Sequence, residues 1–135
     1  MKIEKIRDYF NTCPLLDSRA RLNINYLGVD AIEYSIYTDT IDPVYKRYAD
    51  GGAIKQIGFT FTTLNYHSAE LMQQIENSGF YDEFAEWIER NNDKGILPDI
   101  EGALRIEILT NGYLISAEAD TAQYQIQLKL LYMEV

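Results

Sequence analysis

The strongest constraint on the fold is a strict alternation of apolar and polar residues near the carboxyl end of the chain. Side chains of a β-strand point alternately to the two faces of a sheet, so such a run predicts a strand with one buried and one polar face. The apolar residues are Tyr124, Ile126, Leu128 and Leu130, and the polar residues are Gln123, Gln125, Gln127 and Lys129. The carboxyl-terminal part of the chain therefore belongs to a sheet.

Other segments have the same two-residue period. Two alternating runs, at residues 22–26 and 32–36, flank a turn at residues 28–30 and predict a β-hairpin. A third run, at residues 54–66, predicts a strand with one apolar and one polar face. Its apolar positions are Ile57, Phe59 and Phe61, and its polar positions are Gln56, Thr60 and Thr62. The first half of the chain therefore adds three strands.

Residues 104–108 and 113–117 also alternate, and they flank Asn111 and Gly112. This dipeptide between two alternating runs is a strong signal for a tight hairpin. The sequence therefore predicts that these two strands pair with each other.

Helical periodicity replaces the alternation in three places. A first helix is expected from about Ile3 to Thr12, ended by Pro14, and a short helix is expected around residues 71–75, interrupted at residues 77–79. A further helix is expected from Tyr81 to Arg90, because apolar residues recur from Phe80 onward at the spacing of one helix face. These residues are Phe80, Phe84, Trp87 and Ile88.

Together these elements predict one α+β domain over residues 1–135, with a mostly antiparallel sheet of about six strands covered by two to three helices. We expect Phe84 and Trp87 to pack against the sheet. Their expected neighbours are Ile6, Phe10, Phe59, Phe61, Ile126 and Leu128.

The charge and composition exclude several classes of function. The chain has 135 residues and a net charge of -9, and its densest cationic pair is Lys46 and Arg47, which argues against sequence-specific nucleic-acid binding. Cys13 is the only cysteine, so the chain forms no internal disulfide, and we expect Cys13 to be a small buried residue. The sequence shows neither a signal peptide nor an apolar run long enough to span a membrane, so we expect the protein in the cytoplasm or packed into a particle there.

Acid–base catalysis is the main enzymatic alternative. It would use Glu86 or Glu89 with His67, the only histidine. However, Asp82, Glu83, Glu86 and Glu89 all lie opposite the apolar helix stripe, which is typical of a solvated face. Arg90 is placed to pair with Glu86 four residues earlier.

No cofactor or metal site is expected. The sequence "YHSAE" places only Glu70 at helical spacing from His67, which is too few ligands for a metal ion, and Ser68 is expected to cap a helix. Phosphate-cradling and nucleophile motifs are also missing. By elimination, the chain is predicted to be a non-catalytic building block, or an adaptor that binds one protein partner.

Two features indicate contacts with other proteins. The segment 38–52 is long for a connection, and it contains Tyr45, Lys46, Arg47 and Tyr48, residue types that are common at interfaces. The carboxyl-terminal strand presents Gln123, Gln125 and Gln127 along one face, where they could contact water or another subunit. A mobile loop and a solvated strand are the alternative interpretation.

Several stretches together resemble a family of phage and prophage minor capsid proteins of Gram-positive bacteria. They are "EKIRDYFNTCPLL", "IEYSIYT", "KRYADGG", "IENSGFYDEFAEWIE" and "ILTNGYLISAEADTAQYQIQLKLLY". Members are often labelled chloramphenicol resistance proteins. Chloramphenicol resistance usually implies an acetylating enzyme with the motif H-x-x-x-D-G. This motif is not present at His67, so the sequence does not contain the catalytic residues that the label implies.

At the level of fold, the element order is similar to that of phage tail-terminator and tail-completion proteins. That resemblance implies a structural virion protein at the head–tail junction, assembled in the host cytoplasm into a ring of six subunits that contacts tail-tube and head-completion proteins. An acidic ring would repel the DNA that passes through it. The ring would form by head-to-tail contacts, in which Lys46 and Arg47 pair with Glu86 or Glu89 of the adjacent subunit.

Overall fold

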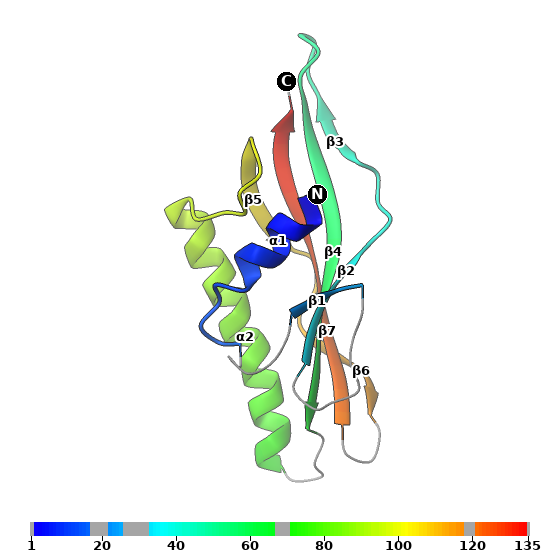
Figure 1. Cartoon of the computed structure of the whole chain (residues 1–135), viewed down its shortest axis with the longest axis vertical. Coiled ribbons are helices and arrows are strands. Elements are labelled where there is room, and N and C mark those ends of the chain that lie inside the picture. Colours follow the sequence, from blue (N-terminus) through cyan, green and yellow to red (C-terminus); the bar gives the residue numbers. More distant parts are fainter. Residues whose placement is uncertain (1, 17–21, 26–32, 67–70, 118–120, 135) are drawn as a thin grey trace.

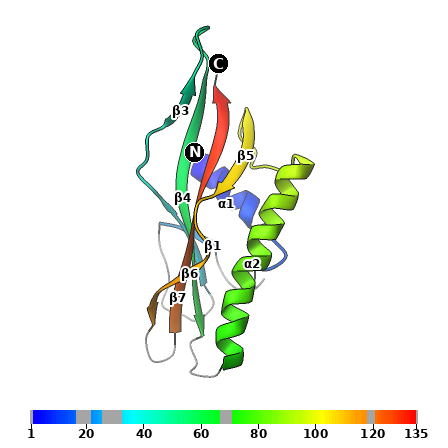
Figure 2. The ribbon, with the colours of Figure 1, turned by 180° about the vertical axis from the view of Figure 1, so that it is seen from behind.

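A computed structural model shows a mixed sheet with helices packed against one of its faces (Figures 1 and 2). It describes residues 2–16, 22–25, 33–66, 71–117 and 121–134, and it describes residues 65–66 and 71–78 by their backbone alone. The elements in these ranges are α1 (Lys2–Phe10), β1 (Leu22–Ile24), β2 (Glu33–Thr38), β3 (Val44–Arg47), β4 (Ala53–Tyr66), α2 (Leu71–Lys94), β5 (Ala103–Ile108), β6 (Tyr113–Ala117) and β7 (Thr121–Glu134). The predicted α+β fold is confirmed.

The sheet is built around the two longest strands, β4 and β7. Each has 14 residues, and the two pair antiparallel along their whole length. The ladder begins with Ala53 opposite Glu134 and ends with Tyr66 opposite Thr121. The ladder is longer than any of the short strands beside it. Two short strands therefore fit end to end along the free edge of each long strand.

The short strands lie end to end along these edges. β2 and β3 both pair antiparallel with β4, while β5 and β6 both pair antiparallel with β7. β1 extends the sheet beyond β2, which gives the order β1-β2-β4-β7-β5. Figure 1 shows that the β3–β4 end of the sheet projects past both helices.

The core lies between one face of the sheet and the two helices. Phe10 of α1 contacts Phe84 of α2 at 5.5 Å between ring centroids, and Phe84 stacks on Phe61 of β4 at 4.5 Å. Phe59, Ile126 and Leu128 are fully buried or nearly so in the same cluster as Trp87 and Ile6. The predicted burial of Phe84 and Trp87 against the sheet is therefore confirmed. Cys13 is also buried, as expected.

Polar contacts fix the carboxyl-terminal half of α2. The Asn91 amide donates to the Tyr9 hydroxyl of α1 at 3.1 Å. The next side chain, Asn92, donates to the carbonyl of Ile106 at 2.8 Å and accepts from the Ile106 amide at 3.0 Å. Asn92 thus makes, from a helix, the two hydrogen bonds that a neighbouring strand would make with β5.

The predicted hairpin over residues 22–36 is wrong. β1 and β2 are parallel, with Leu22 opposite Tyr34 and Ile24 opposite Ile36. A parallel pair needs a connection of a dozen or more residues, and the offset between paired residues here is of that size. The turn expected at residues 28–30 lies outside the described residues. Asn25 ends β1 in a left-handed conformation with φ of 54°, and its side chain accepts a hydrogen bond from the Thr38 amide at 2.9 Å.

Asn111 and Gly112 do not form a hairpin turn. β5 and β6 run in the same direction along β7, so the chain continues forward through residues 109–112. The Leu109 amide donates to the Gln127 carbonyl, and the Gln127 amide donates to Thr110 Oγ1. A Cβ on Gly112 would lie 2.2 Å from Cγ of Tyr81, so the glycine is required by its close approach to α2.

The segment 38–52 is not a plain loop, because it contains β3, and the residue paired opposite Lys46 on β4 is Ile54. A register shift between Val44 and Lys46 makes Tyr45 a bulge residue, which interrupts the two-residue period that identifies a strand in the sequence. Chain reversal occurs later, where the Tyr48 amide donates to the Gly52 carbonyl at 2.8 Å.

The two helices predicted between residues 71 and 90 are a single helix, α2, that continues through residues 77–79. Gly79 weakens a helix without breaking it, and the packed residues that follow it stabilise the helix. The first helix is also shorter than expected, since it ends at Phe10.

The face of β4 that was expected to be polar and solvated is partly buried. Thr62 is fully buried, and Thr60 is 6% exposed. Thr60 Oγ1 donates to the Asp39 carboxylate at 2.8 Å. The side chains of Asp39 and Ile41 therefore cover part of the sheet face opposite the helices, which is called the outer face below.

We expect Trp87→Ala to lower the free energy of unfolding by about 3–5 kcal/mol, because it removes a large side chain from the centre of the aromatic cluster. Chemical denaturation followed by circular dichroism measures this change. Glu89→Ala is the matched control on the exposed face of the same helix, with an expected change within about 0.5 kcal/mol. Equal stability of Trp87→Ala and the parent would contradict the packing described.

Two glycines give a paired test of the close approach at Tyr81. Gly112→Ala should lower the free energy of unfolding by about 1–3 kcal/mol, because the new methyl group overlaps Tyr81. Gly79→Ala should raise it by about 0.5–1 kcal/mol, because the added Cβ in a helix meets no atom within 4 Å. Thermal or urea denaturation of both variants would show opposite signs, and a neutral Gly112→Ala would disprove the contact.

Candidate interaction surface

The β3–β4 hairpin, residues 44–57, forms an arm at one end of the molecule (Figure 1). Its tip is a tight turn in which Gly51 has a φ of 95°, a conformation that favours glycine. The Asp50 carboxylate accepts a hydrogen bond from the Gly52 amide at 3.1 Å. The arm is therefore an ordered hairpin, and it contains residues 44–52 of the segment predicted to contact other proteins.

The four arm residues singled out in the sequence all lie on the surface. Tyr45 is 53% exposed and Tyr48 is 39% exposed. The Lys46 ammonium lies 5.2 Å from the centre of the Tyr48 ring, and the Lys129 ammonium lies 5.0 Å from the centre of the Tyr45 ring. Each ring thus holds a lysine by a cation–π contact, which limits the motion of both side chains.

Lys46 and Arg47 point to opposite faces of the arm. Lys46 is opposite Ile54 and Arg47 is opposite Ala53, and consecutive residues of a strand alternate between faces. Lys46 shares the outer face with Tyr45, whose ring approaches Lys129 there. Arg47 lies on the face that carries the helices. The two cations therefore cannot both contact one flat partner surface.

The base of the arm is fastened to the outer face. Ile41 is 37% exposed and packs over Gly58, where a Cβ would lie 2.9 Å from Cδ1 of Ile41. The Gln56 side-chain amide donates to the Asp42 carbonyl at 2.7 Å, and the Gln56 amide donates to the Pro43 carbonyl at 2.9 Å. These contacts hold residues 41–43 against β4, and Ile41, Asp42 and Tyr45 are all exposed there.

The exposed side of α2 is acidic. Its four regularly spaced carboxylates recur every three to four residues, so they form one stripe along the helix. This stripe consists of Asp82, Glu86, Glu89 and Asp93, all exposed. Glu86 lies 3.8 Å from Arg90, which confirms the predicted pairing. The acidic stripe faces away from the sheet, because Phe84 and Ile88 occupy the opposite side of the helix.

The glutamines of β7 are partly used inside the chain. Gln125 and Gln127 donate to the Tyr113 hydroxyl of β6, and Gln127 does so at 3.2 Å. All three glutamines, including Gln123, are half-buried on the outer face. They therefore contribute less to a free surface than their spacing in the sequence predicts.

The candidate residues fall into two groups on opposite sides of the sheet. Tyr45, Lys46 and the glutamines are on the outer face, whereas Glu86 and Glu89 are on the exposed side of α2. His67, the partner proposed for an acid–base pair, lies outside the described residues, as does Ser68. In the described ranges, no three His, Cys, Asp or Glu side chains gather closely enough to hold a metal ion.

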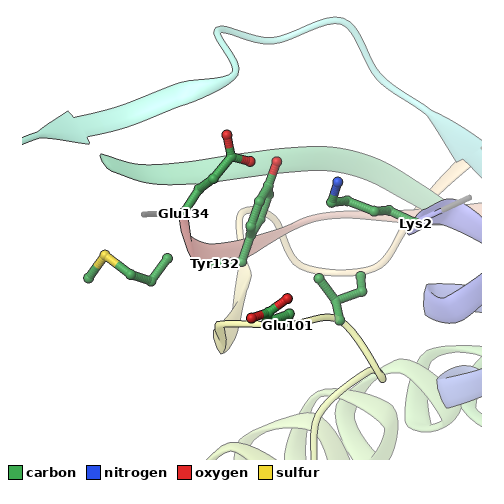
Figure 3. Close-up of a pocket in the computed structure, with 6 residues that line it drawn as sticks. Lys2, Glu101, Tyr132 and Glu134 are labelled. Carbon is green, nitrogen blue, oxygen red and sulfur yellow. The ribbon is translucent and has the colours of Figure 1, made fainter. Parts of the chain in front are cut away.

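A hollow of about 260 Å³ lies at the base of the arm, on the helix side (Figure 3). It is lined by Lys2, Ile100, Glu101, Tyr132, Met133 and Glu134. Figure 3 shows the Tyr132 ring between the Lys2 and Glu134 side chains, and the Lys2 ammonium is 5.3 Å from the ring centre. Sequence patterns could not reveal this hollow, because its residues come from both ends of the chain and from the loop before β5.

A salt bridge beside the hollow shifts the titration of both its members. Lys55 Nζ is 2.8 Å from Glu134 Oε1. This hydrogen bond raises the pKa of the Lys55 ammonium and lowers the pKa of the Glu134 carboxyl. Both groups are open to solvent, so the pair orients the two side chains more than it stabilises the fold.

Two buried tyrosines have structural partners. Burial raises the pKa of Tyr9 to about 12, against the opposing effect of its hydrogen bond with Asn91. Burial also raises the pKa of Tyr81, whose hydroxyl lies 2.8 Å from Thr63 Oγ1. Both hydroxyls connect helices to neighbouring elements and belong to the packing of the core.

Comparisons with known proteins do not assign the chain to a family. A scan against models of protein families finds no match, and a search of curated proteins finds no matching relative. Neither helix, over the residues that the structure describes, has the length and apolar composition needed to cross a membrane.

The raised pKa of Tyr9 predicts a loss of stability at alkaline pH. Between pH 10 and about 12 the unfolded chain releases a phenolic proton that the folded chain retains, so the free energy of unfolding falls as pH rises. The loss should be on the order of 2 kcal/mol over this window. Denaturation at several pH values measures it, and Tyr9→Phe should show a shallower decline.

Asn91→Ala is the control for this experiment. It removes the hydrogen bond to Tyr9 but keeps the buried phenol, so it should be less stable than the parent while retaining the decline between pH 10 and about 12. Equal slopes for Tyr9→Phe and the parent would show that Tyr9 is not the titrating group.

Proposed function

We propose that the chain is a structural protein of a phage or prophage virion, a minor capsid or tail-terminator/tail-completion subunit that acts at the head–tail junction. The observation that carries the proposal is the projecting arm, which presents Tyr45, Lys46, Arg47 and Tyr48 beyond the helices. Exposed aromatic and basic side chains on an ordered hairpin suit a protein–protein contact.

The resemblance of the sequence to phage minor capsid proteins supports the proposal from a second direction. So does the similarity in element order to subunits that close into six-membered rings. In such a ring the subunits contact one another, the tail tube and the head-completion proteins. The net charge of -9 suits a ring through which DNA passes without being held. The protein then resides in the virion, and in the host cytoplasm during assembly.

A non-catalytic role agrees with the placement of the carboxylates. Glu86 and Glu89 are exposed on a helix surface, and Glu86 is paired with Arg90. Acid–base catalysis needs a carboxyl group in a cleft beside its substrate, and an open helix face provides no cleft. An adaptor that uses the arm to bind one protein as a monomer is the second candidate, because the arm alone is sufficient for that role.

The proposal predicts that purified particles of the phage that encodes this chain contain the protein. Mass spectrometry of these particles should detect it, and electron microscopy with a labelled antibody should place it at the head–tail junction. Electron microscopy of the protein alone should show rings when the protein is concentrated. Particles without the protein, together with a monomer at high concentration, would reject the virion role and favour the adaptor.

A further inference from the structure

We propose that the free edge of β6 accepts an extended segment of another protein, which binds as an added strand and carries basic residues at its ends. β6 lies at the end of the sheet opposite the arm (Figures 1 and 2). Among the described strands it pairs with β7 alone, so its other edge carries no described strand. The site is therefore separate from the arm and does not depend on the role proposed for the arm.

The hydrogen bonds of β7 show which backbone groups of β6 point outward. The Gln127 carbonyl accepts from the Leu109 amide, so the backbone of Gln127 faces the edge along which β5 and β6 pair. Backbone groups alternate in direction along a strand, so Gln125 faces this edge too, where it is opposite Tyr113. The next residue of β6, Leu114, therefore directs its amide away from β7. This amide is a hydrogen-bond donor for an added strand.

The side chains of β6 suit a strand that brings apolar residues. Leu114 is 48% exposed and Ile115 is 41% exposed. Leu114 is opposite Tyr124, whose ring lies 6.2 Å from that of Tyr81, so Leu114 is on the sheet face that carries the helices. An apolar side chain of an added strand would pack beside Leu114 on that face. The bulge at Ile115 bends β6 and so favours one register of the added strand over its neighbours.

The other edges of the described sheet are protected. Asn92 bonds both backbone groups of Ile106 on β5, and β3 carries Lys46 and Arg47. β1 has three residues. Covered backbone groups, charged side chains and short strands are features by which native sheets prevent pairing with foreign strands. β6 has five residues without a charge or a proline, so it is the edge of the described sheet that can accept a strand.

The surroundings of β6 are acidic. From Ile108 to Leu128 the sequence has two acidic residues and no basic one. The Tyr81 side chain meets Gly112, which directly precedes β6. The two residues that follow Tyr81 on α2 are exposed carboxylates, Asp82 and Glu83. A strand that lies along β6 is therefore close to negative charge.

Charge complementarity selects the occupant. Between Leu71 and Glu89, α2 adds five acidic residues and no basic one. Lysine or arginine residues at the ends of the bound strand would be attracted to these carboxylates, while an acidic strand would be repelled. A second copy of the chain has the same acidic residues around its own β6, so like charges disfavour pairing between copies. The favoured occupant is a basic-ended strand of a different protein.

Binding of a defined peptide to the full chain tests the proposal. The probe is a peptide of alternating valine and threonine with two lysines at each end, and its control has glutamates in place of the lysines. Two-dimensional NMR should show a shift of the Leu114 amide and slower hydrogen exchange there when the lysine peptide is added. The glutamate peptide should bind about tenfold or more weakly. An unprotected Leu114 amide, or equal affinity for the two peptides, would overturn the proposal.

Two substitutions at one position separate the backbone from the charge contribution. Leu114→Pro removes an amide that the β7 ladder does not use, so the fold should survive while the lysine peptide binds about tenfold more weakly. Leu114→Lys keeps the amide and adds a like charge, with a loss of similar size. Circular dichroism checks the fold, and Leu114→Lys decides alone if Leu114→Pro does not fold.

Leu104→Lys is the matched control on β5. Leu104 is 43% exposed and lies at a register shift of its strand, as Leu114 does. Peptide binding should be unchanged in this variant, because the edge of β5 is already occupied by Asn92. Unchanged binding in the Leu114 variants, or an equal loss in Leu104→Lys, would reject β6 as the site.

Sedimentation of the chain alone tests the rival occupant. Leu114→Lys should leave the sedimentation of concentrated protein unchanged, because copies are not expected to pair through β6. A dimer that dissociates in this variant would show that the occupant is a second copy and would overturn the proposal. Absence of the protein from virions would reject the phage role only, since the peptide measurements concern a different end of the molecule.

Discussion

The antiparallel ladder between β4 and β7 is the constraint on which the rest of the structure depends. These strands pair over 14 residues, and every other strand except β1 pairs directly with one of them. The part of β4 that carries Phe59 and Phe61 supports the core beneath the two helices. The first five ladder residues of β4, 53–57, form the arm with β3 at the end that projects past the helices. The same pair of strands therefore supports both the core and the projecting arm.

Packing around Phe10 connects this ladder to the helices. Its ring contacts Phe59 and Phe61 of β4 and also Phe84 and Trp87 of α2, at 5.5–6.1 Å between centroids. A helix of nine residues such as α1 is not stable by itself in water, so burial of its apolar side must supply its stability. Removing the Phe10 ring would detach α1 and expose the sheet at the same time, so we expect α1 and the sheet to unfold together.

The sequence predicts the faces of these elements better than their partners. Alternation correctly places Phe59, Phe61, Ile126 and Leu128 in the core, because side-chain direction follows from local backbone geometry. Strand direction and pairing depend on contacts far along the chain, so the parallel β1–β2 pair is not visible in the local pattern. Gly112 shows the same limit, since its close approach to Tyr81 is a tertiary contact.

For the candidate surface, too, the sequence predicts the residue types but not their arrangement in space. The prediction of an interface rests on the residue types at Tyr45, Lys46 and Tyr48, which can be read from the sequence. Their arrangement on a hairpin cannot, because the bulge at Tyr45 interrupts the alternation that identifies a strand. The opposite directions of Lys46 and Arg47 follow only from the register with β4. The Asn92 side chain also blocks part of the free edge of β5. Its side chain occupies both backbone hydrogen-bonding groups of Ile106, so a foreign strand cannot extend the sheet there without breaking two bonds, and this edge is protected against aggregation.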